Sequence, residues 1–102
     1  MKLERIAWPD ESAPDPEELR RRLEADGFEA FRWQDSPGAD YQPHSHDHDE
    51  SLWLISGAIT FGIGGADYRL APGDRLMLPG GTVHTALAGP RGADYWIGQR
   101  RE

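Results

Sequence analysis

Residues 38–57 read GADYQPHSHDHDESLWLISG. Three of the four histidines of the chain lie in this segment, within a stretch of five residues. On an extended strand, His44 and His46 would face the same side with their Cα atoms about 7 Å apart, close enough to bind one ion. Glu50 has the same parity, but a straight strand would carry it about 13 Å beyond His46. Ligands that each lie about 2.1 Å from one metal ion cannot be so far apart. If Glu50 is a ligand, the chain must therefore bend at residues 47–49, where two aspartates favour a turn.

Residues 44–50, taken alone, also fit a solvated loop that binds metal only loosely. The glycines around them favour the structured alternative. Gly38 precedes His44 by six residues, and Gly57 follows Glu50 by seven. Farther along the chain, the fourth histidine closes a second group of spaced residues, which are Gly73, Pro79, Gly81 and His84.

These positions resemble the two motifs of the cupin superfamily. The first motif, G-x5-H-x-H-x3-E-x6-G, is met at Gly38, His44, His46, Glu50 and Gly57. The second, G-x5-P-x-G-x2-H-x3-N, is met at Gly73, Pro79, Gly81 and His84. Ala88 stands where the family usually has Asn, a residue that is generally not a metal ligand. The short spacer between the motifs is similar to that of small bacterial and archaeal members.

The resemblance implies an all-β fold, a jelly-roll barrel that holds one divalent transition metal ion near its mouth. The ligands that it implies are His44, His46, Glu50 and His84. Such a set suits iron, manganese, nickel, copper or zinc without selecting among them. The remaining histidine of the segment, His48, is expected to lie in the bend, exposed to solvent and outside the ligand set.

The function that the resemblance implies is that of a mononuclear metal-binding protein with a small-molecule ligand or substrate. We expect an enzyme, most simply a metal-dependent dioxygenase or other oxidoreductase, with an isomerase or a lyase as further possibilities. The alternative is a non-catalytic module that binds or senses a metal or a small ligand. No phosphate-binding loop and no Ser/His/Asp order supports kinase or hydrolase chemistry.

One helix and several short strands are predicted around the motifs. Asp15 as N-cap, Pro16 at the first position and Gly27 past the end delimit a helix whose buried face carries Leu19 and Leu23. Strands are expected at residues 28–33, 51–56, 58–63, 68–71, 75–78, 82–88 and 95–97, separated by Gly and Pro breaks. Residues 62–65 lie between two strands, so their glycines predict a hairpin turn. We expect one domain, with residues 1–27 as lead-in and helix and residues 28–102 as the barrel.

Side-chain parity assigns part of the barrel wall. Leu52 and Leu54 follow Glu50 inward, which turns Trp53 and Ile55 outward. These two large side chains need cover from the helix or from a second subunit, and small cupins are commonly dimers, so a homodimer is expected. Gln42 shares the parity of His44, and its side chain is therefore a candidate for a hydrogen bond to a ligand or substrate.

Other polar residues are candidates by type alone. Arg75 and Met77 share one face of their strand while Leu76 and Leu78 share the other, and parity does not say which face is interior. An inward Arg75 would anchor an anionic substrate. General acids or bases of suitable type are Tyr41, Tyr68, Tyr95 and Asp40.

Composition excludes several classes of function. The 102 residues contain no cysteine, which rules out a disulfide scaffold, a cysteine zinc site and a thiol nucleophile. The formal charge is −7, from 18 acidic and 11 basic side chains, which disfavours nucleic acids and anionic membranes as partners. With no secretory hydrophobic region and no apolar run of membrane length, a cytoplasmic protein is expected.

Overall fold

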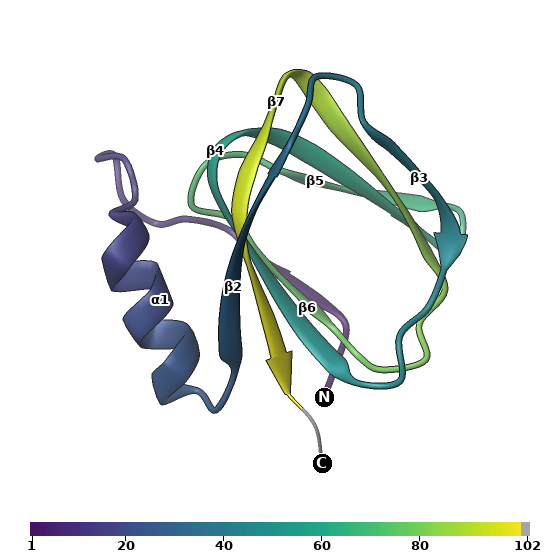
Figure 1. Cartoon of the computed structure of the whole chain (residues 1–102), viewed down its shortest axis with the longest axis horizontal. Coiled ribbons are helices and arrows are strands. Elements are labelled where there is room, and N and C mark those ends of the chain that lie inside the picture. Colours follow the sequence, from purple (N-terminus) through teal and green to yellow (C-terminus); the bar gives the residue numbers. More distant parts are fainter. Residues whose placement is uncertain (101–102) are drawn as a thin grey trace.

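The computed structural model describes residues 1–100, which form one helix and seven strands (Figure 1). Their order and bounds are β1 (Glu4–Ile6), α1 (Pro16–Ala25), β2 (Glu29–Asp35), β3 (Asp40–His44), β4 (Asp49–Ile63), β5 (Ala66–Leu70), β6 (Arg75–Leu78) and β7 (His84–Arg100). No helix in this part of the chain is both long and apolar enough to cross a bilayer.

The strands form an antiparallel jelly roll organised by the two longest ones, β4 and β7. Their first and last halves pair with different neighbours, so each strand passes through both layers of the barrel. One layer runs in the order β1-β6-β4-β7-β2. In the other layer, β5 pairs with the end of β4 and β3 with the start of β7. The expected all-β jelly-roll fold with one short helix is therefore confirmed.

Glycines bend the long strands without ending them. The breaks expected at residues 56–57 and 89–90 are instead irregularities inside β4 and β7, where the register between the two strands shifts. Gly57 has φ +80°, and a Cβ there would lie 2.2 Å from the carbonyl oxygen of Gly92. The backbones of the two paired strands approach closely at this irregularity, and only glycine leaves room for it.

The hairpin expected at residues 62–65 is confirmed. Ile63 pairs with Ala66 across a two-residue loop of Gly64 and Gly65, both with positive φ. A two-residue turn of this kind requires positive φ at both central positions, which explains the glycine pair.

Helix α1 begins and ends where the sequence predicts. Pro16 is its first residue, and after Ala25 the amides of Gly27 and Phe28 donate to the carbonyls of Glu24 and Leu23. With Gly27 at φ +91°, this is a Schellman motif. The side chain of Asp15 makes no capping hydrogen bond, so the proline and the backbone alone set the start of the helix.

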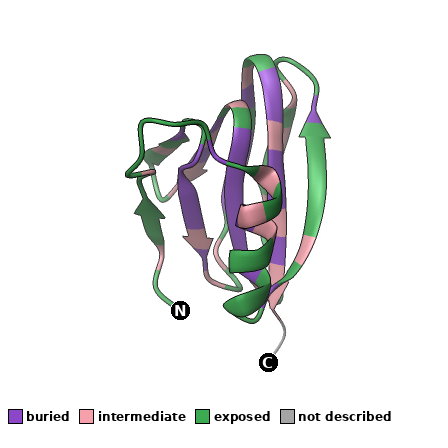
Figure 2. Ribbon diagram, turned by 90° about the vertical axis from the view of Figure 1, so that its left-hand side faces the viewer, coloured by how far each residue is buried: buried purple, intermediate pink, exposed green. Residues whose placement is uncertain are grey.

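Two apolar clusters lie on opposite faces of the larger layer. The interior cluster contains Leu52, Leu54, Leu76 and Leu78, together with residues of β5 and β7. The outer cluster joins the helix to the sheet through Leu19, Leu23, Phe28, Trp53, Ile55 and Trp96. The parity predicted from Glu50 is thus confirmed, and the outward-facing side chains pack against the helix, which lies across this face of the sheet (Figure 2). Burying Leu19 and Leu23 completely contributes about 1.5–3 kcal/mol each.

Arg75 lies on the outer face, beneath the helix. Its Cζ atom is 4.4 Å from the centre of the Trp53 ring, Nε donates to Ser51 Oγ at 2.6 Å and Nη1 lies 2.9 Å from Asp26 Oδ2. Leu76 and Leu78 occupy the interior face of the same strand. An anchoring role for Arg75 toward a substrate in the barrel is therefore wrong, because the sheet separates them.

The lead-in contains a strand that the sequence did not reveal. β1 pairs with β6 in the register Glu4 to Met77 and Ile6 to Arg75. All three residues of β1 are exposed, so no alternation of apolar and polar residues marks it.

Candidate metal centre

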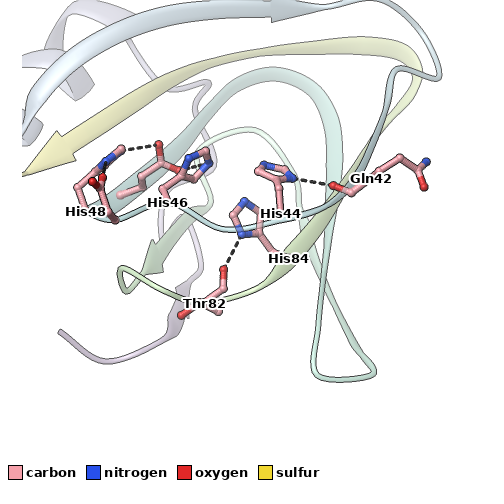
Figure 3. Close-up of polar contacts among 8 residues, drawn as sticks. Gln42, His44, His46, His48, Thr82 and His84 are labelled. Atoms are coloured by element: carbon pink, nitrogen blue, oxygen red, sulfur yellow. Dashed lines mark hydrogen bonds and ion pairs between the residues drawn. The ribbon is translucent and has the colours of Figure 1, made fainter.

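Three histidines converge inside the barrel from two paired strands. His44 ends β3 and lies directly opposite His84, the first residue of β7, with ring centres 4.3 Å apart. His46 follows just beyond β3, and its ring centre lies 5.0 Å from that of His44 and 5.4 Å from that of His84. One nitrogen from each ring lies within 4.8 Å of the others. Figure 3 shows the three rings turned toward one another. This group could hold a metal ion.

Backbone carbonyls orient two of these rings. His44 Nδ1 lies 2.7 Å from the Gln42 carbonyl oxygen, and His84 Nδ1 lies 2.9 Å from that of Thr82. A carbonyl can only accept, so the proton of a neutral ring sits on Nδ1 and Nε2 keeps its lone pair. This is how metal-binding histidines are commonly held. Burial also lowers the pKa of His84, which favours the neutral form that binds metal.

Glu50, the fourth predicted ligand, lies beside His46. The chain bends at Asp47 and His48, as the ligand geometry required, and β4 then returns Glu50 to the cluster. Glu50 Oε1 is 3.6 Å from His46 Nε2, and the side chain is 7% exposed. The structure thus brings all four predicted residues into one region, with the three imidazoles closest together and the carboxylate at one side. Their role as ligands stays a prediction.

His48 is not exposed as expected. It lies in the bend, but its side chain is only 11% exposed, and Nε2 points at Glu50 Oε2 across 3.3 Å. The expectation fails because the bend turns the His48 ring back toward the start of β4. In an extended loop the same ring would point to solvent.

The expectation for the Gln42 side chain rested on parity, and the parity is broken. The register between β3 and β7 shifts between Tyr41 and His44, so Tyr41 lines the cavity together with His44. Gln42 is exposed, and its side chain points away from the histidines (Figure 3). What Gln42 supplies to the cluster is its backbone carbonyl. A contact of its side chain with a substrate stays a prediction without structural support.

The histidines open into a cavity of about 260 Å³. Its wall has an apolar part formed by Leu52, Phe61, Ala86 and Ile97. The other lining residues are polar or amphipathic, namely Trp33, Tyr41, Tyr95 and Gln99, besides the three histidines and Glu50. A cavity of this size fits a small organic molecule.

Asp35 anchors the aromatic part of this wall, and sequence reasoning missed it. It is 8% exposed and accepts hydrogen bonds from Tyr95 Oη at 2.7 Å, Tyr41 Oη at 2.5 Å and Trp33 Nε1 at 2.9 Å. A lone aspartate at a strand end carries no motif. The available signal was that Trp33 and Asp35 share one face of the strand.

The tyrosines stay protonated because of this carboxylate and their surroundings. The hydrogen bond to Asp35 raises the pKa of Tyr41, and burial, with the same carboxylate, raises the pKa of Tyr95. Each hydroxyl proton is directed at Asp35, so the hydroxyl oxygens have lone pairs left for other donors. Of the residues proposed by type as acids or bases, Tyr41 and Tyr95 line the cavity, whereas Tyr68 and Asp40 do not.

Known proteins resemble this chain in both sequence and fold. A family model described as the cupin domain matches residues 31–89. The structure of KdgF from Halomonas sp. is 30% identical with a TM-score of 0.62, covering 74% of this chain and 70% of that chain. The DMSP lyase DddQ from Ruegeria pomeroyi DSS-3 is 25% identical with a TM-score of 0.67, covering 74% of this chain and 39% of the lyase.

A variant of oxalate decarboxylase from Bacillus subtilis shares the fold. It is 24% identical with a TM-score of 0.62, covering 70% of this chain and 20% of that one. No curated protein matches the chain significantly in sequence. Since the family model spans more than half of the residues, and the barrel and histidine cluster have the expected form, the chain belongs to the cupin family.

Proposed function

We propose that the protein is a mononuclear metalloenzyme that acts on a small organic molecule. The observation that carries this proposal is the convergence of His44, His46 and His84 on the wall of the cavity. A bound divalent transition metal would supply Lewis acidity and, as iron, a site for O₂ chemistry. Glu50 is the proposed fourth ligand, and the open side of the cluster faces the space where a substrate would lie.

The wall around the cluster supports catalysis over simple binding. Tyr41 and Tyr95 present hydroxyl oxygens that Asp35 fixes in place, and such oxygens can accept hydrogen bonds from a substrate and so orient it. A module that only binds metal has no need of an ordered polar wall. The alternative, a non-catalytic metal- or ligand-binding cupin, would use the same histidines without these groups.

For the reaction class, we propose oxidoreductase chemistry of the dioxygenase type. Imidazole and carboxylate ligands with open positions are the donor set of non-haem iron oxygenases. A lyase is the second candidate, because the similar structure from Ruegeria pomeroyi DSS-3 is that of a DMSP lyase. That comparison involves 39% of the lyase, so its substrate is not carried over to this chain.

Metal content is the first test. Protein purified without a histidine tag should carry close to one transition metal ion per chain by elemental analysis. His46→Ala should abolish this loading because it removes one of the three converging imidazoles, and the one that also lies beside Glu50. Ser45→Ala, at the exposed neighbouring position, is the matched control and should leave it unchanged. Wild-type protein that stays metal-free after exposure to iron, manganese, nickel, copper and zinc would refute the metalloenzyme.

Nitric oxide, used as a stand-in for O₂, tests the reaction class. Iron(II)-loaded protein treated anaerobically with nitric oxide should show the electron paramagnetic resonance signal of an S = 3/2 iron–nitrosyl centre. That signal requires an open coordination position on the cavity side. Its absence from a protein that holds iron would contradict the dioxygenase and leave the lyase as the proposal.

A further inference from the structure

His48 and Glu50 form a contact that the three-histidine cluster does not use. The two oxygens of Glu50 face different rings, with Oε1 at 3.6 Å from His46 Nε2 and Oε2 at 3.3 Å from His48 Nε2. The side chains of Glu50 and His48 are only 7% and 11% exposed. A buried carboxylate therefore sits between two imidazoles, one of which lies outside the ligand set that the family motif implies.

These three residues have the geometry of a metal site. His46, His48 and Glu50 each offer one ligand atom, and the three atoms lie within 4.8 Å of one another, as in the three-histidine group. Adjacent ligands at about 2.1 Å from one ion lie about 3.0–3.4 Å apart in octahedral or tetrahedral geometry. The observed separations are close to these values, with 3.3 Å from His48 Nε2 to Glu50 Oε2 and 3.6 Å from His46 Nε2 to Glu50 Oε1, so a carboxylate that binds through both oxygens fits them. Two imidazoles and one carboxylate are also a common donor set for divalent iron, manganese and zinc.

The orientation of the His48 ring supports a ligand role. Its Nδ1 lies 3.1 Å from Asp47 Oδ1, just as Nδ1 of His44 and of His84 meets a backbone carbonyl. When Nδ1 carries the proton of the neutral ring, Nε2 has a lone pair that faces the lone pairs of Glu50 Oε2. In that tautomer no proton joins the two atoms, and a cation bound by both would link them through two bonds.

The bend that carries His48 is supported by the loop before β7. The amide of Gly81 donates to the His46 carbonyl oxygen at 2.7 Å, and the amide of Gly80 donates to Asp49 Oδ1 at 2.8 Å. Gly80 also packs so closely on His48 that a Cβ there would lie 3.2 Å from the His48 carbonyl carbon. The bend is thus held on both sides of His48, which limits the reorganisation needed to bind an ion.

We propose that the protein has a second metal position, formed by His46, His48 and Glu50, that overlaps the first. The positions share His46 and Glu50, and because His46 Nε2 can bind only one ion at a time, occupancy of one position excludes the other and the protein still holds one ion per chain. The inference rests on the metal-binding part of the proposed function and is independent of catalysis. It departs from the expectation that His48 lies outside the ligand set.

Removing a ligand that belongs only to the first position tests the proposal. Cobalt(II) is the probe, titrated into apo-protein and followed by its visible absorption, with a competing chelator to fix the dissociation constant. His84→Ala should weaken binding at least tenfold and change the spectrum, yet still bind one ion per chain at the second position. Adding His48→Ala to that variant should weaken binding by a further tenfold or more. His48→Ala alone should change affinity by less than about threefold.

The controls separate loss of a ligand from loss of the fold. Because His84 is buried, His44→Ala serves as a second variant that breaks the same triad at a less buried position. Gln42→Ala added to His84→Ala is the matched control for the double variant and should have no further effect. Circular dichroism of each apo-protein verifies folding.

Three results would overturn the second position. One is that His84→Ala and His44→Ala, both folded, bind no cobalt at all. Another is that adding His48→Ala to either variant changes nothing. The last is that His48→Ala alone abolishes binding, which would make His48 a ligand of the first position. Failure of wild-type protein to bind any metal would instead refute the proposed function itself.

Discussion

Asp35 shows how much one side chain organises in this barrel. Its buried carboxylate accepts hydrogen bonds from Tyr41, Tyr95 and Trp33, all of which line the cavity. An isolated buried carboxylate would be costly, whereas three neutral donors satisfy it without a cation. The residue thereby fixes three aromatic rings around the cavity next to the histidines, although Asp35 is not itself among the lining residues.

Tyr95→Phe should therefore destabilise the protein more than its small change in shape suggests. It removes one donor from a buried carboxylate, which costs about 1–3 kcal/mol of the free energy of unfolding. Chemical denaturation of wild type and variant measures the difference. Tyr68→Phe on β5, outside the Asp35 cluster, is the matched control and should cost less than about 0.5 kcal/mol. Equal effects of the two substitutions would show that Asp35 does not depend on Tyr95.

His84 should make the stability of the apo-protein depend on pH. Burial lowers its pKa in the folded state, whereas in the unfolded chain the pKa is about 6.5. Below that pH the unfolded chain binds a proton that the folded protein does not, so stability falls as the pH decreases, by at most about 1.4 kcal/mol per pH unit. Above about pH 7 this contribution is constant.

The test compares wild type with His84→Asn by denaturation from pH 7 to pH 5 in the presence of a chelator. The variant should show the shallower loss of stability, because the other titrating groups are present in both proteins. A steeper or identical slope for the variant would contradict the role assigned to His84.

The sequence predicts those site residues that match the spacing of a known family motif. It fails where local backbone geometry decides which way a side chain points or which residues meet. The positions of His44, His46, Glu50 and His84 follow from such a spacing. Asp35 stands alone in the sequence, and only the fold brings two tyrosines to it. The parity argument for Gln42 fails for the same reason, because the register shift after Tyr41 reverses the side on which Gln42 lies.

At the scale of elements, the irregularity in the β4–β7 pairing lies where both strands pass from one layer of the barrel to the other. Gly57 stands where the two strands touch, with φ +80° and the carbonyl oxygen of Gly92 at 2.2 Å from the place a Cβ would take. The sequence pattern predicts strands on either side of this glycine and a break at the glycine itself. A glycine that ends a strand and a glycine that bends one give the same pattern in the sequence.

Gly57→Ala should consequently be among the most damaging single changes outside the interior. The positive φ alone costs about 1–2 kcal/mol for a residue with a Cβ, and the backbone clash adds to it. We expect a total loss above about 4 kcal/mol in the free energy of unfolding, or failure to fold. Gly38→Ala, at φ +73° with no atom within 4 Å of its Cβ position, isolates the conformational cost. Similar losses of the free energy of unfolding in the two variants would show that the close approach of β4 and β7 at Gly57 tolerates a Cβ.

On the scale of the whole molecule, the two faces of the larger layer have separate tasks. The inner face lines the cavity, opposite the histidines of β3 and of the start of β7, and the outer face carries the helix, which seals Trp53 and Ile55 from water. This helix removes the reason for which a second subunit was expected to cover these residues. The interface of a homodimer must therefore lie on a surface that the helix does not cover.

We propose that a homodimer forms along β2. This strand is at the end of the sheet order, pairs only with β7 among residues 1–100, and exposes 45% of Phe31 and 51% of Trp33. Its exposure along most of its length is evident in Figure 2. An edge strand whose outer side has no partner and which exposes large apolar side chains is a template for pairing with another chain. Because Trp33 also lines the cavity, a second copy on this edge would form part of the cavity rim.

Light scattering at micromolar concentration should give a particle of two 11.4 kDa chains. Phe31→Glu places a charge on the proposed interface and should yield the monomer, since a buried unpaired carboxylate is costly. Leu87→Glu, at an equally exposed apolar position on the half of β7 that pairs with β3, should leave the dimer intact. A wild-type particle of a single chain contradicts the dimer. A dimer broken by Leu87→Glu and kept by Phe31→Glu would move the interface to the other layer, away from the cavity rim.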